Sequence, residues 1–133
     1  MRKLFFVFSI VFLIQTAYCQ TATEFFEQGK EKANMGKYYA AITDFNKAIE
    51  QDPNFAKAYI CRAAAKEKTS DFEGAIIDYT KVIEIIPDSY LAFYNRGLAK
   101  IVIRQKESAC EDFRKALELG YGRAGTAIQD NCQ

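Results

Sequence analysis

Apolar residues return every three or four positions in six stretches of this chain, with polar residues between them. This spacing places the apolar side chains on one face of an amphipathic helix. We therefore expect three pairs of helices, each pair joined by a short break. The first helices are expected around Thr23–Met35, Lys57–Thr69 and Leu91–Ile103, and the second helices from near Tyr38, Phe72 and Lys106 to about Gln51, Ile85 and Leu119.

The second helices carry the same kinds of residue at an interval of 34 positions. A small residue, an aspartate and a large aromatic residue recur in this order: Ala41, Asp44 and Phe45, then Ala75, Asp78 and Tyr79, then Ala109, Asp112 and Phe113. Pro53 and Pro87 recur too, and each ends the helix before it because proline lacks a backbone N–H. A fixed period of this length predicts an array of units that bury their apolar faces against their neighbours.

The three units resemble tetratricopeptide repeats over nearly the whole chain. Small residues stand at the family's small position in the first helix, and aromatic residues at the position that is normally tryptophan: Gly29, Ala63 and Gly97, and Phe25, Tyr59 and Phe93. The resemblance implies an all-α fold, a right-handed superhelix (an α-solenoid) whose concave face binds peptides or partner proteins. A domain at residues 20–133 would hold repeats at about 22–55, 56–89 and 90–123.

The resemblance also implies which side chains line the concave face. The inward-facing positions of the first helices hold Phe26, Lys30, Ile60, Ala64, Tyr94, Leu98 and Ile101. The groove would be polar toward the first repeat and apolar toward the third, where apolar side chains of a partner would dock near Tyr94, Leu98 and Ile101. Alternatively, this apolar end packs beneath a closing C-terminal helix. The basic clamp with which some family members hold a terminal carboxylate is absent, because its positions hold Phe26, Lys30, Cys61, Leu91 and Asn95.

A lysine stands in each unit where the family usually has tyrosine. These lysines are Lys32, Lys66 and Lys100, and they share the period of the aspartates at positions 44, 78 and 112. We expect each lysine to form an ion pair with the aspartate of its own unit and so to join the two helices. The alternative is that the lysine stems lie along apolar surface with the ammonium groups in water.

The end of the chain predicts a closing helix. The turn Gly120–Gly122 precedes a short helix expected at about residues 124–131, which would cap the array. Cys110 and Cys132 each lie eleven residues from Tyr121, so an antiparallel hairpin would bring them to the same level. We expect a disulfide between them, the alternative being two independent buried thiols. Cys61 is then expected to be a small core residue.

The first 19 residues have the layout of a secretory signal peptide. Arg2 and Lys3 precede the apolar run Leu4–Ile14, and Ala17 and Cys19 suit cleavage before Gln20. Two alternatives stay open, namely an uncleaved anchor helix and a lipoprotein with Cys19 as its lipidated residue. We expect an exported protein, periplasmic or secreted, which would meet a membrane only through one of these two alternatives.

The composition excludes several classes of function. The chain has no histidine, and it shows no nucleophile–base arrangement, glycine-rich phosphate loop or metal-ligand motif. We therefore expect no enzyme, no cofactor and no metal. A net charge of +1 without charge runs argues against nucleic acid as a partner. The sequence predicts a non-catalytic interaction module that binds a protein or peptide; alternatives are a permanent subunit of an outer-membrane or secretion assembly, and a thiol-based redox factor.

Overall fold

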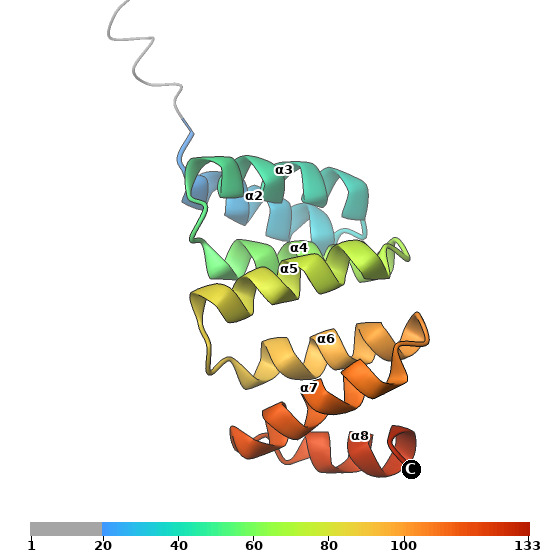
Figure 1. The fold of residues 1–133 in the computed structure, drawn as a ribbon. Helices are drawn as coiled ribbons and strands as arrows, with labels where there is room; N and C mark the ends of the chain where they lie inside the picture. Colours follow the sequence, from blue (N-terminus) through green and yellow to red (C-terminus); the bar gives the residue numbers. More distant parts are fainter. Residues whose placement is uncertain (1–19) are drawn as a thin grey trace, which may run out of the picture.

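The computed structural model describes residues 20–133, and every regular element in this part of the chain is a helix. The helices are α2 (Ala22–Asn34), α3 (Tyr38–Gln51), α4 (Ala56–Lys68), α5 (Phe72–Ile85), α6 (Tyr90–Val102), α7 (Lys106–Glu118) and α8 (Arg123–Asn131) (Figure 1). The all-helical prediction is therefore confirmed. The predicted signal peptide lies outside the described residues. None of the helices described has the length and apolar character that a membrane crossing requires.

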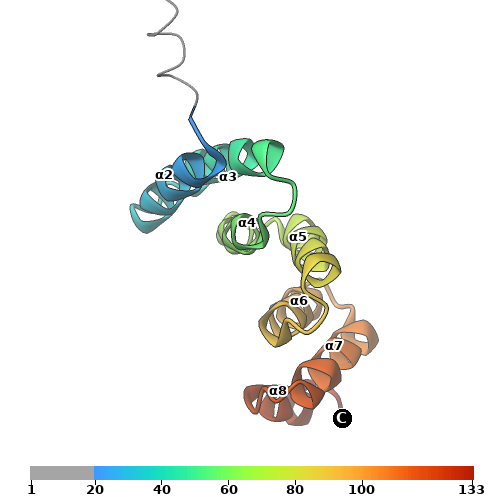
Figure 2. The same ribbon diagram turned by 90° about the vertical axis from the view of Figure 1, so that its left-hand side faces the viewer.

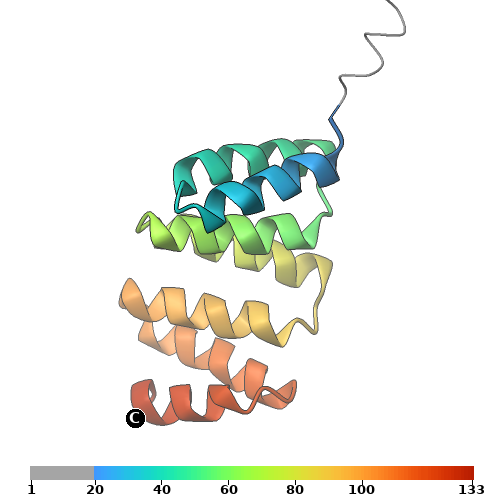
Figure 3. The same ribbon diagram turned by 180° about the vertical axis from the view of Figure 1, so that it is seen from behind.

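The helices stack in chain order as three antiparallel hairpins followed by α8. Helix α2 packs on α3, α4 on α5 and α6 on α7, and each hairpin also contacts the next one (Figures 1 and 3). Seen along the stack, α2, α4, α6 and α8 lie on the inner side of a curve, and α3, α5 and α7 lie on its outer side (Figure 2). This arrangement gives the first helices and α8 a shared concave face.

Small residues allow the two helices of a hairpin to approach closely. A Cβ atom added to Gly29 would lie 2.6 Å from Cε1 of Phe45, and one added to Gly97 would lie 2.6 Å from Cε1 of Phe113. Both aromatic rings are fully buried. Because packed interiors leave no room for an extra carbon atom at such distances, the glycines set the spacing of the first and third hairpins.

The turns inside the hairpins use a left-handed residue at the same position of each unit. Gly36 has φ +75°, and Ser70 and Arg104 both have φ +64°. Glycine adopts this conformation without steric cost, whereas a residue with a Cβ atom is strained there. The turn geometry is therefore kept in all three hairpins although only the first has the residue that favours it.

Candidate partner-binding site

Ion pairs between lysines and buried aspartates hold the first helices against the second ones. Lys32 Nζ lies 2.5 Å from Asp44 Oδ2, Lys66 Nζ 3.0 Å from Asp78 Oδ2, and Lys100 Nζ 2.7 Å from Asp112 Oδ2. The predicted ion pairs are therefore confirmed in all three hairpins. The three aspartates are buried, so each of these pairs fixes the orientation of two helices from inside the hairpin.

Two arginines that the sequence analysis missed complete this network. Arg62 donates from Nε and Nη2 to the two carboxylate oxygens of Asp78, at 2.9 and 2.6 Å. Its Nη1 donates to Asn46 Oδ1 of the preceding hairpin at 2.7 Å. Arg96 makes the same fork to Asp112 and reaches Thr80 Oγ1 at 3.0 Å. The sequence contained a signal for these contacts, because arginine recurs at an interval of 34 residues in the first helices of the second and third units.

The first hairpin lacks this arginine. Gln28 stands at the position of Arg62 and Arg96, and no hairpin precedes it in the described chain. Asp44 is buried, and within residues 20–133 its Oδ2 atom has no partner with hydrogen-bond geometry, although the Lys32 ammonium lies beside it as an ion-pair partner. The side chain of Asp44 is thus the least satisfied of the three equivalent carboxylates.

Some predicted groove residues belong to the core. Phe26 is only 7% exposed and packs on Phe45 and Phe55, with ring centroids 6.0 and 4.9 Å away. Its side chain is therefore not a free concave surface, contrary to the placement that the sequence suggested. The aromatic ring was assigned by its position in the unit, which gives the direction of a side chain but not what covers it.

At the apolar end of the groove, some of the predicted residues are packed in the core and others are exposed. Tyr94 packs on Tyr121 and Phe113, with centroids 4.9 and 5.8 Å away. Ile101 also packs against the buried cluster that α8 closes, as the alternative interpretation expected. Leu98, in contrast, is 40% exposed. Ile60 is half-buried and packs against the cluster between α4, α5 and α6.

Leu98 is the centre of an exposed apolar strip on α6. Leu91 and Val102 are 46% and 55% exposed, and their spacing from Leu98 places all three on one helical face. We call these three residues the α6 ridge. The equivalent positions are Lys57, Ala64 and Lys68 on α4 and Thr23, Lys30 and Asn34 on α2. The inner face therefore changes from polar and basic near α2 to apolar on α6.

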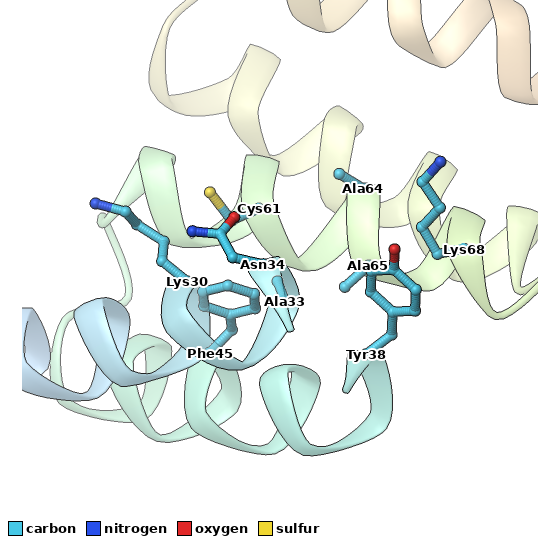
Figure 4. A pocket seen from close by; sticks show the side chains of 9 residues that line it. All are labelled: Lys30, Ala33, Asn34, Tyr38, Phe45, Cys61, Ala64, Ala65 and Lys68. Carbon is cyan, nitrogen blue, oxygen red and sulfur yellow. The ribbon is translucent and has the colours of Figure 1, made fainter. Parts of the chain in front are cut away.

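Lys30 and Ala64, both predicted to lie on the concave face, meet at a cavity between α2, α3 and α4. This α2–α4 cavity has a volume of about 190 Å³ and is lined by Lys30, Ala33, Asn34, Tyr38, Phe45, Cys61, Ala64, Ala65 and Lys68 (Figure 4). Cys61 was expected to be a core residue; it packs against the core but also lines this cavity as a free thiol. Burial raises the pKa of the Cys61 thiol, so it is mostly uncharged near neutral pH.

A second recess of about 310 Å³ lies where α6 meets α8. Tyr94 and Leu98 border it together with Arg123, Thr126, Ala127, Asp130 and Asn131. Helix α8 is held on α7 by its buried alanines and by a bond between Cys110 and Cys132, whose Cα atoms are 5.8 Å apart. The polar outer residues of α8 therefore form one wall of the concave face next to the α6 ridge.

Comparison with known proteins places this architecture in a family. Residues 24–70 match the model of the TPR repeat, the tetratricopeptide repeat. No curated protein sequence matches the chain. The first TPR domain of Spaghetti (RPAP3), bound to the HSP90 peptide SRMEEVD, has 26% identity and a TM-score of 0.80, covering 86% of this chain and 92% of that one.

Two further solved structures of TPR domains are similar to this chain. The second TPR domain of Spaghetti, bound to the same peptide, has 30% identity and a TM-score of 0.71, covering 75% of this chain and 93% of that one. The second TPR domain of human RPAP3, in complex with the HSP70 peptide SGPTIEEVD, has 28% identity and a TM-score of 0.78, covering 84% and 95%. With 30% identity to the second TPR domain of Spaghetti over 75% of its own length, together with the repeat match at residues 24–70, the chain belongs to the tetratricopeptide-repeat proteins. The predicted α-solenoid is confirmed.

Proposed function

We propose that this chain is an exported, non-catalytic adaptor that holds a segment of a partner protein on its concave face. The observation that carries the proposal is the α6 ridge, which exposes three large aliphatic side chains on an inner-face helix. Solved TPR domains similar to this chain are bound to peptides, which supports a peptide-binding role. Apolar side chains at this density on one helical face favour burial against a partner. The tetratricopeptide repeat is generally a protein-interaction fold, which agrees with a binding role rather than a chemical one.

The partner segment differs from the peptides in the related structures. Those peptides end in several acidic residues, whose recognition requires cationic side chains in the groove. Of the five positions where some family members carry a carboxylate clamp, Phe26, Cys61 and Leu91 lack the required chemistry, and only Lys30 and Asn95 have suitable side chains. We therefore propose recognition through aliphatic contacts at the α6 ridge, without capture of a terminal carboxylate there.

The experiment compares two substitutions of the same kind. Leu98→Lys places a charge in the α6 ridge, and Ile77→Lys places one on α5 at a position that is 67% exposed and outside the concave face. Partners are cross-linked to the full chain in its native cell and quantified by mass spectrometry. We expect Leu98→Lys to lose the specific partner and Ile77→Lys to keep it. Equal partner recovery with both variants would refute a role for the ridge.

The proposed export rests on the predicted signal peptide and is tested separately by the intact mass of the native protein. A chain that starts at Gln20 and is two hydrogens lighter than the reduced form would support cleavage and the Cys110–Cys132 bond. A diacyl adduct on Cys19 would instead make the protein a lipoprotein. A mass that retains residues 1–19 without modification would contradict export by cleavage.

A further inference from the structure

Helix α8, which closes the array, has little helical stability of its own (Figure 1). It has nine residues, whereas an isolated helix shorter than about 12–15 residues is marginal in water. Gly125 lies inside it and lowers its helix propensity. Its N-cap residue, Gly122, makes no side-chain hydrogen bond to the first turn. Helix α8 therefore depends on its attachment to α7 to stay folded.

The side-chain contacts of α8 are small. Ala124 and Ala127 are its buried residues, and Ile128 packs beside them. At the two earlier junctions between hairpins an arginine hydrogen-bonds to the preceding hairpin, but Asp130 stands 34 residues after Arg96. Within residues 20–133, no ion pair joins α8 to another helix. The junction of α7 with α8 thus lacks the polar link that the earlier junctions have.

The bond between Cys110 and Cys132 fastens the end of α8 to α7. Cys110 lies within α7, and Cys132 is the C-cap residue of α8. Lys106 Nζ also donates to the backbone oxygen of Gln133 at 2.9 Å, but this contact is exposed to solvent. Local unfolding requires little free energy where few apolar contacts are buried. We therefore expect α8 to detach from α7 when the bond is reduced.

A recess of about 300 Å³ gives access to this bond. It is bordered by both cysteines and by four charged residues: Lys106, Glu107, Cys110, Glu111, Arg114 and Cys132. Cys132 is half-buried, whereas Cys110 is only 4% exposed. Thiol–disulfide exchange begins when a thiolate reaches one of the two sulfur atoms, so attack at Cys132 is favoured. The nearby cations of Lys106 and Arg114 favour the thiolate that leaves on Cys110.

We infer that the Cys110–Cys132 bond is a thiol–disulfide exchange site through which a dithiol releases α8. One thiolate of the dithiol attacks Sγ of Cys132, the S–S bond breaks, and Sγ of Cys110 leaves with the electron pair and takes up a proton. The second thiolate of the dithiol then attacks the dithiol sulfur of the mixed disulfide and releases Cys132, which also takes up a proton. The two cysteines gain two electrons and two protons, and the dithiol loses them as it becomes a disulfide.

Release of α8 would change the concave face. Arg123, Thr126 and Asp130 of α8 border the recess that Tyr94 and Leu98 also line. Detachment removes this wall beside the α6 ridge, so partner affinity should depend on the redox state of the two cysteines. This consequence rests on the proposed function, whereas the exchange site does not.

The first test compares α8 in the full chain before and after reduction by dithiothreitol, a small dithiol. Alkylation and mass spectrometry report the state of each cysteine, and hydrogen–deuterium exchange reports the stability of each helix. We expect reduction to remove nearly all protection of the α8 amides, while α2–α5 stay protected. The double variant Cys110→Ser with Cys132→Ser should behave like the reduced chain, and Cys61→Ser, which removes the free thiol, should behave like the wild type.

The second test asks whether the bond is attacked in the folded chain. The rate of reduction by dithiothreitol should be nearly constant at urea concentrations below the unfolding transition, because the recess is open in the folded state. Arg114→Gln removes a cation from the recess and should slow reduction about two- to threefold. Lys115→Gln removes the next cation of α7, which is exposed and outside the recess, and should leave the rate unchanged.

Four outcomes would overturn the inference. These are reduction only after urea unfolds the chain, α8 amides as protected after reduction as before, equal rates for Arg114→Gln and Lys115→Gln, or free thiols at both cysteines in protein isolated without reductant. The proposed function fails independently, by equal partner recovery with Leu98→Lys and its control. A partner that depends on Leu98 but is retained equally by the oxidised and reduced chains would reject only the effect of α8 on the concave face.

Discussion

Replacing Gln28 by arginine should stabilise the chain, because it supplies the fork that the first hairpin lacks. In the second hairpin Arg62 satisfies both carboxylate oxygens of Asp78, while Lys66 provides a second cation. In the first hairpin Lys32 is the cation beside Asp44, and the buried Oδ2 atom accepts no well-aligned hydrogen bond from the part of the chain that the structure describes. An arginine at position 28 starts from the helical position equivalent to that of Arg62, so we expect it to reach the two carboxylate oxygens of Asp44.

The size of the effect follows from opposing contributions. A hydrogen bond to a charged group contributes about 1.5–3 kcal/mol net when it is well shielded. The first hairpin is less shielded, since the Lys32 side chain is 39% exposed compared with 17% for Lys66. Ordering a long arginine side chain costs up to about 2 kcal/mol. We therefore expect Gln28→Arg to raise the free energy of unfolding by about 1 kcal/mol, which corresponds to about 4 °C in Tm for a domain of this size.

The assay is a double-mutant cycle. Unfolding by heat and by urea is followed by circular dichroism for the wild type, Gln28→Arg, Asp44→Asn and the double variant. The gain from the arginine should be present with Asp44 and largely absent in the Asp44→Asn background. Gln28→Lys is the control, because it adds the charge without the fork. An equal gain in both backgrounds would refute the reasoning, since the arginine would then act through something other than the carboxylate.

Three further predictions concern the turns, a half-buried acid and the disulfide. Arg104→Gly should stabilise the chain by about 0.5–1 kcal/mol and Gly36→Arg should destabilise it, because both positions have positive φ; urea unfolding checks both. Burial raises the pKa of Glu67, so its stabilising contribution is present at low pH and is lost as the pH rises through the folded-state pKa. Glu67→Gln should therefore gain more over the wild type at about pH 7 than at about pH 4, and an equal difference at both would contradict this. Cleavage of the Cys110–Cys132 bond, which closes a separation of 22 residues, should lower stability by about 2–4 kcal/mol, and an unchanged Tm on reduction would show that the bond contributes nothing.

The lysine–aspartate pairs show which side-chain contacts can be predicted from the repeat alone. Lys66 and Asp78 lie twelve positions apart on two helices that face each other, so their contact followed from the helical period and the hairpin. Arg62 could be assigned to the first helix with equal ease. Its contact with Asn46, however, joins two successive hairpins, and the distance between hairpins is not encoded in the period of one unit.

The predicted concave set shows the limit more clearly. Lys30 and Ala64 do meet at one cavity, and Leu98 is exposed. Phe26 and Tyr94 were assigned by the same rule, but one is covered by Phe55 and the other packs on Tyr121. Both covering residues lie in connections between helices, whose course the helical pattern does not specify. The partner-binding role of the set stays a prediction.

The sequence by itself determined the helices, their pairing and the residues that let them pack. These features are local or repeat at a fixed interval, so periodicity reveals them: the apolar spacing within a helix, the prolines that end it, and a glycine opposite a large ring. Only the tertiary structure decided which inward-facing side chains remain exposed and where space is left between the helices. The α2–α4 cavity depends on how much space the side chains of Ala33, Cys61 and Ala64 fill together, and these residues come from two hairpins. The residue pattern within one hairpin does not reveal this combined volume.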